Sequence, residues 1–431
     1  MTTLLSFLFV LGVLIFIHEL GHFAVAKILG IKVEKFSLGF PPKMVGKKIG
    51  ETEYCLSWIP LGGYVRMAGD NPEEELTGSP REFLSRPRWQ RGLVIIAGPA
   101  MNYLFAILVV WLILSITGIG TYPAVIGEIA ENSPAQSMGL KVEDRLTSIN
   151  EIPVSTWDEI IESLPRDGGQ VIVQVQRSGQ ALQLAGELPP QTSERFDQLG
   201  ILPLFTTEVG EVEKDGPAWQ AGIRGGDVIE AVNGIPVTRW SEMAGLIQSR
   251  PDTLIALRWR HGEQIYDDTL ITRSMEVPGE DGELIAAGYV GITSKIILKR
   301  IGPFQAASES IRWTLWTTRE IFQFIKGLIT GRVSARMVGG PIFIAQVAGQ
   351  TARQGFTVLV YFMAMLSVNL ALINVLPIPV LDGGQLCILL VESLKGGSLS
   401  QRQRMIVQQV GLALIILLII FVMFNDVDRL L

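Results

Sequence analysis

Long runs of apolar residues divide the chain, and four of them are long enough to cross a bilayer. They lie at about 4–29, 93–119, 358–376 and 406–424. A transmembrane helix needs about 20 consecutive, mostly apolar residues. The pattern therefore predicts a multi-pass α-helical membrane protein with four transmembrane helices. The third run contains Asn369 and Asn374 and is the least apolar of the four.

The composition agrees with a membrane protein. Hydrophobic residues make up 48% of the 431 residues and charged residues only 18%, whereas soluble domains carry about 25% charged residues. The net charge of −6 gives no sign of a nucleic-acid partner. The predicted partner of the apolar runs is the lipid bilayer, and the oligomeric state stays open.

Lysine and arginine residues near the runs predict the orientation, because cytoplasmic loops carry an excess of both. They follow the first run and precede the second: Lys27, Lys32, Lys35, Lys43, Lys47, Lys48, Arg86, Arg88 and Arg91. This loop is therefore expected in the cytoplasm, with the N-terminus and the region from 121 to about 300 outside. Lys395, Arg402 and Arg404 return the loop between the last two runs to the cytoplasm.

The region between the second and third runs contains an internal repeat, the usual sign of a duplicated unit. "IGEIAENSPAQSMGLKVEDRLTSINEIPVSTWDEI" starts at Ile126, and "VGEVEKDGPAWQAGIRGGDVIEAVNGIPVTRWSEM" aligns with it without a gap from Val209. The sequence pattern of each copy predicts short strands, turns and a helix. The arrangement resembles the PDZ domain in its circularly permuted bacterial form, which implies two external PDZ-like α+β domains at 121–205 and 206–297.

The PDZ resemblance also implies a binding site in each copy. The loops "LGI" (199–201) and "VGI" (290–292) would receive a peptide C-terminus beside an edge strand. A purely steric role for the two copies is the alternative. Residues 298–355 follow, and their apolar spacing predicts an amphipathic helical linker on or near the membrane surface.

The first apolar run carries "HELGH", with His18 and His22 four residues apart. On a helix, this spacing places both imidazoles on one face, within reach of one metal ion. Glu19 is able to lie beside the metal as a general base. The alternative is two histidines that only hydrogen-bond within a helix bundle. Ionisable residues inside apolar helices are rare and usually functional, so the pattern favours a zinc site.

A catalytic zinc site normally has three protein ligands and an open position. The third histidine, His261, lies in "WRHGEQ" of the external repeat and is better explained as a turn residue. Asp382 is the better candidate, because Pro377 and Pro379 interrupt the helical pattern just before it. Irregular backbone at membrane depth occurs only inside protein or beside a water-filled cavity. Spacing alone does not show that Asp382 meets the histidines.

An early intramembrane H-E-x-x-H, a late N-x-x-P-x-P-x-L-D-G from Asn374 and the intervening repeats together resemble the site-2 protease family over essentially the whole chain. The resemblance implies that His18, His22 and Asp382 bind Zn²⁺ and that Glu19 activates the bound water. It also implies that Asn374 helps to hold the substrate backbone.

Two segments, "FSLGFPPK" from Phe36 and "IPLGGYVRM" from Ile59, match family regions that fold back into the membrane as β-structure. Pro41 departs from the related "GFG" pattern, where glycine is usual. Within the second segment, Gly62, Gly63 and Tyr64 are expected to bind substrate. An edge strand over 54–67 would pair with an unwound substrate. The membrane domains would then be 1–120 and 356–431, with the β-structure between 30 and 91.

The resemblance implies a zinc-dependent intramembrane endopeptidase in the bacterial inner membrane, with the N-terminus and both repeats in the periplasm. Its expected substrates are single-span membrane proteins: an anti-sigma factor in envelope stress signalling, and remnant signal peptides. A membrane-anchored PDZ adaptor and an ion transporter are the alternatives. Glu19 directly follows the first histidine, which serves hydrolysis better than transport.

Overall fold

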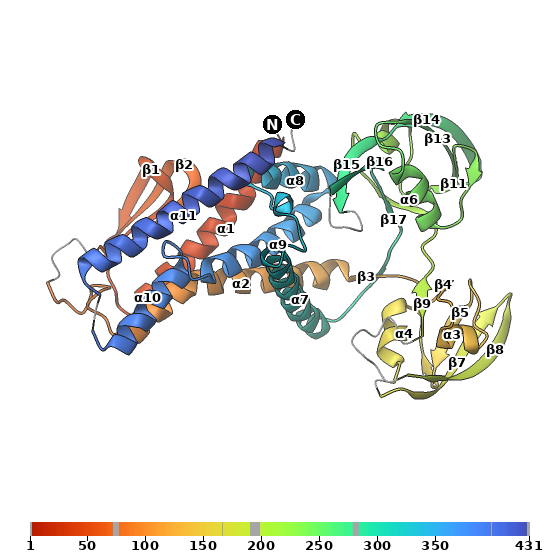
Figure 1. Cartoon of the computed structure of the whole chain (residues 1–431), viewed down its shortest axis with the longest axis horizontal. Helices are drawn as coiled ribbons and strands as arrows, with labels where there is room; N and C mark the ends of the chain where they lie inside the picture. Colours follow the sequence, from red (N-terminus) through yellow and green to blue (C-terminus); the bar gives the residue numbers. More distant parts are fainter. Residues whose placement is uncertain are drawn as a thin grey trace. The chain divides into compact units, whose positions relative to one another are not determined.

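The computed structural model describes residues 2–71, 77–165, 167–189, 199–278, 284–397 and 399–428. The chain divides into two compact units (Figure 1). The first consists of Met1–Ile116 with Gly302–Leu431, and the second of Thr117–Ile301. The termini of the chain therefore belong to the same unit, and the internal repeat forms the other.

Four helices of the first unit are long and apolar enough to cross a membrane: α1 (Thr2–Ile28), α2 (Arg88–Thr117), α9 (Phe356–Val375) and α11 (Gln401–Asp428). They correspond to the four predicted runs. Half of the apolar span of α2 is buried inside the protein, against 11% of that of α11. The helix α2 is therefore central in the bundle, and α11 leaves most of its apolar surface for lipid.

Small residues bring α1 and α2 together. A Cβ atom added to Gly21 of α1 would lie 2.2 Å from the carbonyl oxygen of Ala97 in α2, so only glycine fits there. Close approach through small residues is typical of membrane helix pairs. This contact brings the face of α1 that carries the two histidines against α2.

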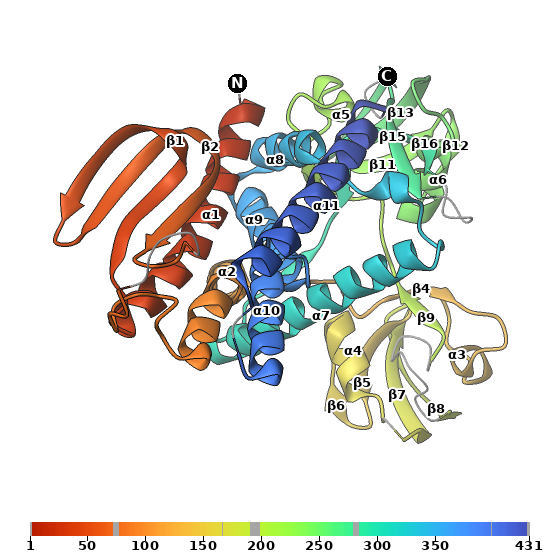
Figure 2. The ribbon, with the colours of Figure 1, turned by 60° about the vertical axis from the view of Figure 1, so that its left-hand side comes forward.

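Strands β1 (Val33–Ile49) and β2 (Thr52–Met67) form a folded-back sheet beside α1 (Figure 2). Leu38 pairs with both Gly63 and Leu56, so the first half of β1 lies between the two ends of β2. Tyr54 pairs with residues of β1 on both sides. The predicted edge strand over 54–67 is thus wrong in its first part. Residues 63–67 of β2 pair with β1 on one side alone.

The helical pattern breaks where the prolines predict it. Helix α9 ends at Val375, and α10 (Asp382–Lys395) begins at Asp382. The two glycines after the aspartate, Gly383 and Gly384, make close contacts with the break. A Cβ atom at Gly383 would lie 2.1 Å from the carbonyl oxygen of Val375, and one at Gly384 2.2 Å from that of Ile378. The glycines thus let the start of α10 pack tightly on the break, which fixes Asp382.

The predicted amphipathic linker contains two long helices, α7 (Pro303–Ile329) and α8 (Pro341–Gln354), with the short η2 (Ala335–Met337) between them. Helix α8 packs against α1 and α9. Its first N–H groups donate to the buried Asp426 near the end of α11. Helix α7 leaves large apolar side chains such as Phe304 and Trp316 exposed. Its position at a membrane surface stays a prediction.

The first repeat copy has its own buried core and a four-stranded sheet in the order β6-β5-β7-β8. Its elements are β3 (Ile119–Thr121), β4 (Ile126–Ile129), α3 (Pro134–Ser137), β5 (Arg145–Ile149), β6 (Ile152–Pro153), α4 (Trp157–Ser163), β7 (Gly169–Arg177), β8 (Gln180–Leu188) and β9 (Ile201–Pro203). Strand β4, near the start of the copy, pairs with β9 at its end. The loop at 199–201 leads into β9.

The second copy repeats this order as β12-β11-β13-β14 around a separate core. Its elements are β10 (Val209–Val212), α5 (Pro217–Gln220), β11 (Val228–Val232), β12 (Ile235–Pro236), α6 (Trp240–Gln248), β13 (Leu254–His261), β14 (Gln264–Ile271), β15 (Arg273–Pro278), β16 (Leu284–Tyr289), β17 (Ile292–Ser294) and β18 (Ile297–Lys299). His261 ends β13 beside a turn, as expected, and its Nδ1 lies 2.5 Å from Asp227.

Candidate metal centre

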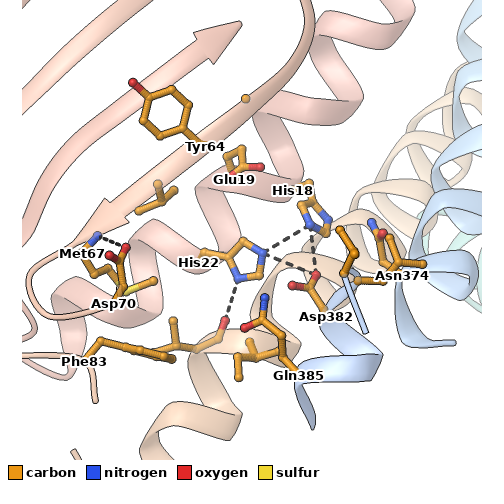
Figure 3. Close-up of a pocket in the computed structure, with 16 residues that line it drawn as sticks. His18, Glu19, His22, Tyr64, Met67, Asp70, Phe83, Asn374, Asp382 and Gln385 are labelled. Atoms are coloured by element: carbon orange, nitrogen blue, oxygen red, sulfur yellow. Dashed lines mark hydrogen bonds and ion pairs between the residues drawn. The ribbon is translucent and has the colours of Figure 1, made fainter. Parts of the chain in front are cut away.

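Three side chains from distant parts of the chain converge in the first unit. His18 and His22 are one turn apart on α1, and Asp382 is the first residue of α10. The Nε2 atoms of His18 and His22 lie 3.1 and 3.5 Å from Oδ2 of Asp382, and 3.3 Å from each other (Figure 3). Within the described ranges, this is the one group of His, Cys, Asp or Glu residues found able to hold a metal ion.

The triangle has the dimensions of a zinc site. A tetrahedral zinc ion with bonds of about 2.0–2.1 Å separates its ligand atoms by roughly 3.3–3.4 Å, close to the three distances given above. Oδ2 of Asp382 is buried and has no hydrogen-bond partner among the described residues. A cation between these atoms would compensate the buried carboxylate and the lone pairs of the imidazoles. The donor set of two imidazoles and one carboxylate therefore fits zinc.

Helix α2 shapes the other side of the two imidazoles. The Nδ1 atom of His22 lies 2.8 Å from the carbonyl oxygen of Val94 and donates to it. A Cβ atom at Gly98 would lie only 2.4 Å from Nε2 of His22. One turn further, the amide of Asn102 lies 3.4 Å from Nδ1 of His18. Three successive turns of α2 thus meet the imidazoles. Val94 supplies a hydrogen-bond acceptor, Gly98 leaves room for the rings, and Asn102 supplies a side-chain amide.

Sequence reasoning missed Gly98 and Asn102. The available signal was the same one that revealed the histidines, namely a polar residue inside an apolar run. Asn102 is such a residue, and it is fully buried. Nothing in the sequence gave the distance between α1 and α2, so the need for glycine at position 98 could not be inferred.

Glu19 lies beside the three residues but is not one of them (Figure 3). The backbone of Val65 faces its carboxylate. A Cβ atom at Gly63 would lie 2.9 Å from the side chain of Ile15 and 3.1 Å from that of Glu19. Glycine at position 63 therefore allows the edge of β2 to approach α1 closely enough to meet Glu19.

The other predicted substrate residues divide into two groups. Asn374, Gly63 and Tyr64 line the same cavity as the three converging residues, and the hydroxyl of Tyr64 points away from them (Figure 3). Gly62 does not line this cavity. A Cβ atom there would lie 2.1 Å from the ring of Phe40, so Gly62 makes room for that ring. Its role toward substrate stays a prediction.

The cavity has a volume of about 460 Å³ and combines apolar walls with the polar side chains of Asp70 and Gln385. A neighbouring cavity of about 150 Å³ shares these two residues and extends to Arg91, Glu392 and Gln408. A water molecule occupies about 30 Å³ of liquid, so the larger cavity has room for several. Polar walls of this kind allow water at the depth of the apolar helices.

A membrane-embedded metalloprotease is the class that this fold and site define, and comparison with known proteins agrees. The chain belongs to peptidase family M50, the site-2 proteases, whose model matches residues 6–418. It is therefore a zinc metalloprotease of the site-2 type, and the predicted resemblance is confirmed.

Relatives match over nearly their whole length. Regulator of sigma-E protease RseP of Escherichia coli (strain K12) is 34% identical over 99% of this chain and 98% of its own. The protein of the same name from Salmonella typhimurium is 35% identical over the same shares. A Neisseria meningitidis protein, whose name proposes a zinc metalloprotease, is 34% identical over 100% of both chains.

Among solved structures, a PDZ domain of an SdrC-like protein from Listeria monocytogenes is 19% identical and covers 22% of this chain and 90% of its own. Its TM-score of 0.18 is too low to establish a shared fold.

The space at Gly98 gives a direct prediction. Gly98→Ala places a methyl group where the imidazole of His22 lies, so the ring must move away from the other two residues. We expect zinc affinity to fall by about 10- to 100-fold, the usual effect of disturbing groups around a metal ligand. The measurement is the zinc retained by the purified full chain during titration with a chelator.

Gly12→Ala is the matched control, because Gly12 lies on α1 and has no heavy atom within 4 Å of its added Cβ. This control should retain zinc like the unchanged protein. Equal zinc retention by Gly98→Ala would contradict the described contact between α2 and the histidines.

Proposed function

We propose that this protein is an intramembrane endopeptidase that cleaves the transmembrane segments of single-span membrane proteins. The proposal rests on one observation above all: the triangle of His18, His22 and Asp382 beside Glu19, in a cavity lined by membrane-spanning helices. We assign the first three residues as the zinc ligands and Glu19 as the general base.

A zinc ion held by these residues would supply a water of lowered pKa and would polarise a peptide carbonyl. Glu19 is close enough to the ligands to accept the proton of the attacking water and is free to pass it to the leaving amine. The backbone of Val65 faces the carboxylate, and its N–H would orient it. The side-chain amide of Asn374, at the end of α9, lines the same cavity and would hydrogen-bond to the substrate backbone.

The substrate must be extended before it is cut, because the carbonyl groups of a helix are held in hydrogen bonds. The one-sided edge at 63–67 offers backbone N–H and C=O groups beside Glu19. Strand addition at this edge would replace the hydrogen bonds lost when the substrate helix unwinds. This is the substrate-binding role that we propose for Gly63 and Tyr64.

We propose that the protein lies in a bacterial inner membrane, with the basic loop around 30–91 in the cytoplasm and the N-terminus in the periplasm. The second unit would then be periplasmic. The relatives named regulator of sigma-E protease support a role in envelope stress signalling. The substrates of this protein would be an anti-sigma factor already shortened outside the membrane, and remnant signal peptides.

We further propose that residues 121–205 and 206–297 are PDZ-like domains. Their shared strand order supports this assignment. In both copies the glycine of the proposed peptide loop, Gly200 or Gly291, has a positive φ. Its carbonyl accepts a hydrogen bond from the backbone N–H of the residue that follows β4 or β10, Ala130 or Glu213. The pair would exclude substrates that still carry bulky external domains, or bind peptide C-termini.

The general base gives the sharpest test of catalysis. Glu19→Gln keeps the size of the side chain but cannot accept the proton, so cleavage of a single-span substrate should fall by about 10²- to 10⁴-fold. Zinc content should remain unchanged, because Glu19 is not one of the ligands. The measurement is cleavage by the purified full chain in lipid, alongside metal analysis.

Cleavage by Glu19→Gln at the original rate would refute the assignment of the base. Loss of zinc from the same variant would show that Glu19 is a ligand instead. A PDZ adaptor, in contrast, would keep its whole function after His18→Ala combined with His22→Ala.

The proposed exclusion of bulky substrates predicts a gain of function. A variant that lacks residues 121–295 should cut a substrate with an intact external domain, which the full chain leaves uncut. The measurement compares this substrate with a matched one whose external domain has been removed. A deletion variant that cuts the short substrate but not the long one would rule out the filter.

A further inference from the structure

If both histidines bind zinc through Nε2, each needs a hydrogen-bond acceptor for its Nδ1–H group. A neutral imidazole that binds metal through Nε2 carries its hydrogen on Nδ1 and needs an acceptor there. For His22, that acceptor is the carbonyl oxygen of Val94 at 2.8 Å. The corresponding group near Nδ1 of His18 is the side-chain amide of Asn102 at 3.4 Å.

The amide of Asn102 that lies beside His18 carries an unused acceptor. The residue is 0% exposed, and its Oδ1 has no hydrogen-bond partner within the described part of the chain. The nitrogen and oxygen of an amide have nearly the same shape, and the hydrogen-bond network decides their order. With Oδ1 turned toward His18, the Nδ1–H group and the buried oxygen satisfy each other. The opposite order would place two donors face to face.

The backbone around Asn102 is fixed. Its carbonyl oxygen accepts a hydrogen bond from the fully buried hydroxyl of Ser367 on α9, at 2.8 Å. Gly98 lies one turn before it on α2, and its missing side chain lets the two imidazoles come this close. The second helix therefore fixes the backbone of Asn102, and the side-chain amide lies beside His18.

We propose that Asn102 is a positioning residue for the metal centre. Its side-chain oxygen accepts the Nδ1–H of His18 and so holds this imidazole in the tautomer and orientation that present Nε2 to zinc. Helix α2 then orients both histidines, through a backbone carbonyl for His22 and a side-chain amide for His18. This inference rests on the proposed function, because it takes His18 as a zinc ligand.

The test is the zinc dissociation constant of the purified full chain, measured by competition with a chelator. Asn102→Leu keeps the approximate volume and removes the acceptor, and should weaken zinc binding about 10- to 100-fold. Asn102→Asp restores an acceptor of the same size and should bind zinc at least as tightly as the unchanged protein. Asn369→Leu, on α9 and outside the cavity lining, is the matched control and should have no effect.

Unchanged zinc affinity in Asn102→Leu would overturn the inference. So would Asn102→Asp with zinc binding as weak as that of Asn102→Leu, since an acceptor would then make no difference. Asn102→Asp decides the matter even if the leucine variant does not fold. His18→Ala separates the two levels of the proposal: if it keeps full zinc affinity, the ligand assignment itself fails, whatever Asn102 does.

Discussion

The packing of the first unit follows from one constraint: placing two imidazoles and a carboxylate among apolar helices costs free energy. Such groups are tolerated there when a cation, protein partners and water surround them. The close packing of Gly21 on Ala97 brings α1 to α2, and Gly383 and Gly384 lock the start of α10. Both arrangements serve to collect the three side chains around one point.

The same constraint explains the sheet beside α1. A protease must offer the extended substrate a partner for its backbone, and Gly63 allows the one-sided edge of β2 to reach Glu19. Val65, on this edge, faces the proposed base. In the proposed mechanism, substrate alignment and proton transfer therefore depend on one short stretch of strand, while the proposed zinc ligands come from helices.

Much of this architecture could be predicted from sequence, because it follows from local patterns. Apolar runs gave the four helices, the four-residue spacing placed His18 and His22 on one face, and the ungapped repeat gave two copies with one strand order. Asp382 needed the family resemblance as well, since spacing does not show which distant segments meet. The features that were missed depend on distances between elements: the space at Gly98, the amide of Asn102 and the true extent of the edge strand.

The most direct test of the central claim is the X-ray absorption spectrum of zinc in the purified Asp382→Cys variant. If Asp382 completes the site with His18 and His22, the new thiolate replaces one oxygen ligand. The spectrum should then contain one sulfur neighbour at about 2.3 Å beside nitrogen and oxygen neighbours at about 2.0–2.1 Å. Zinc bound in this variant with nitrogen and oxygen neighbours alone would contradict the account.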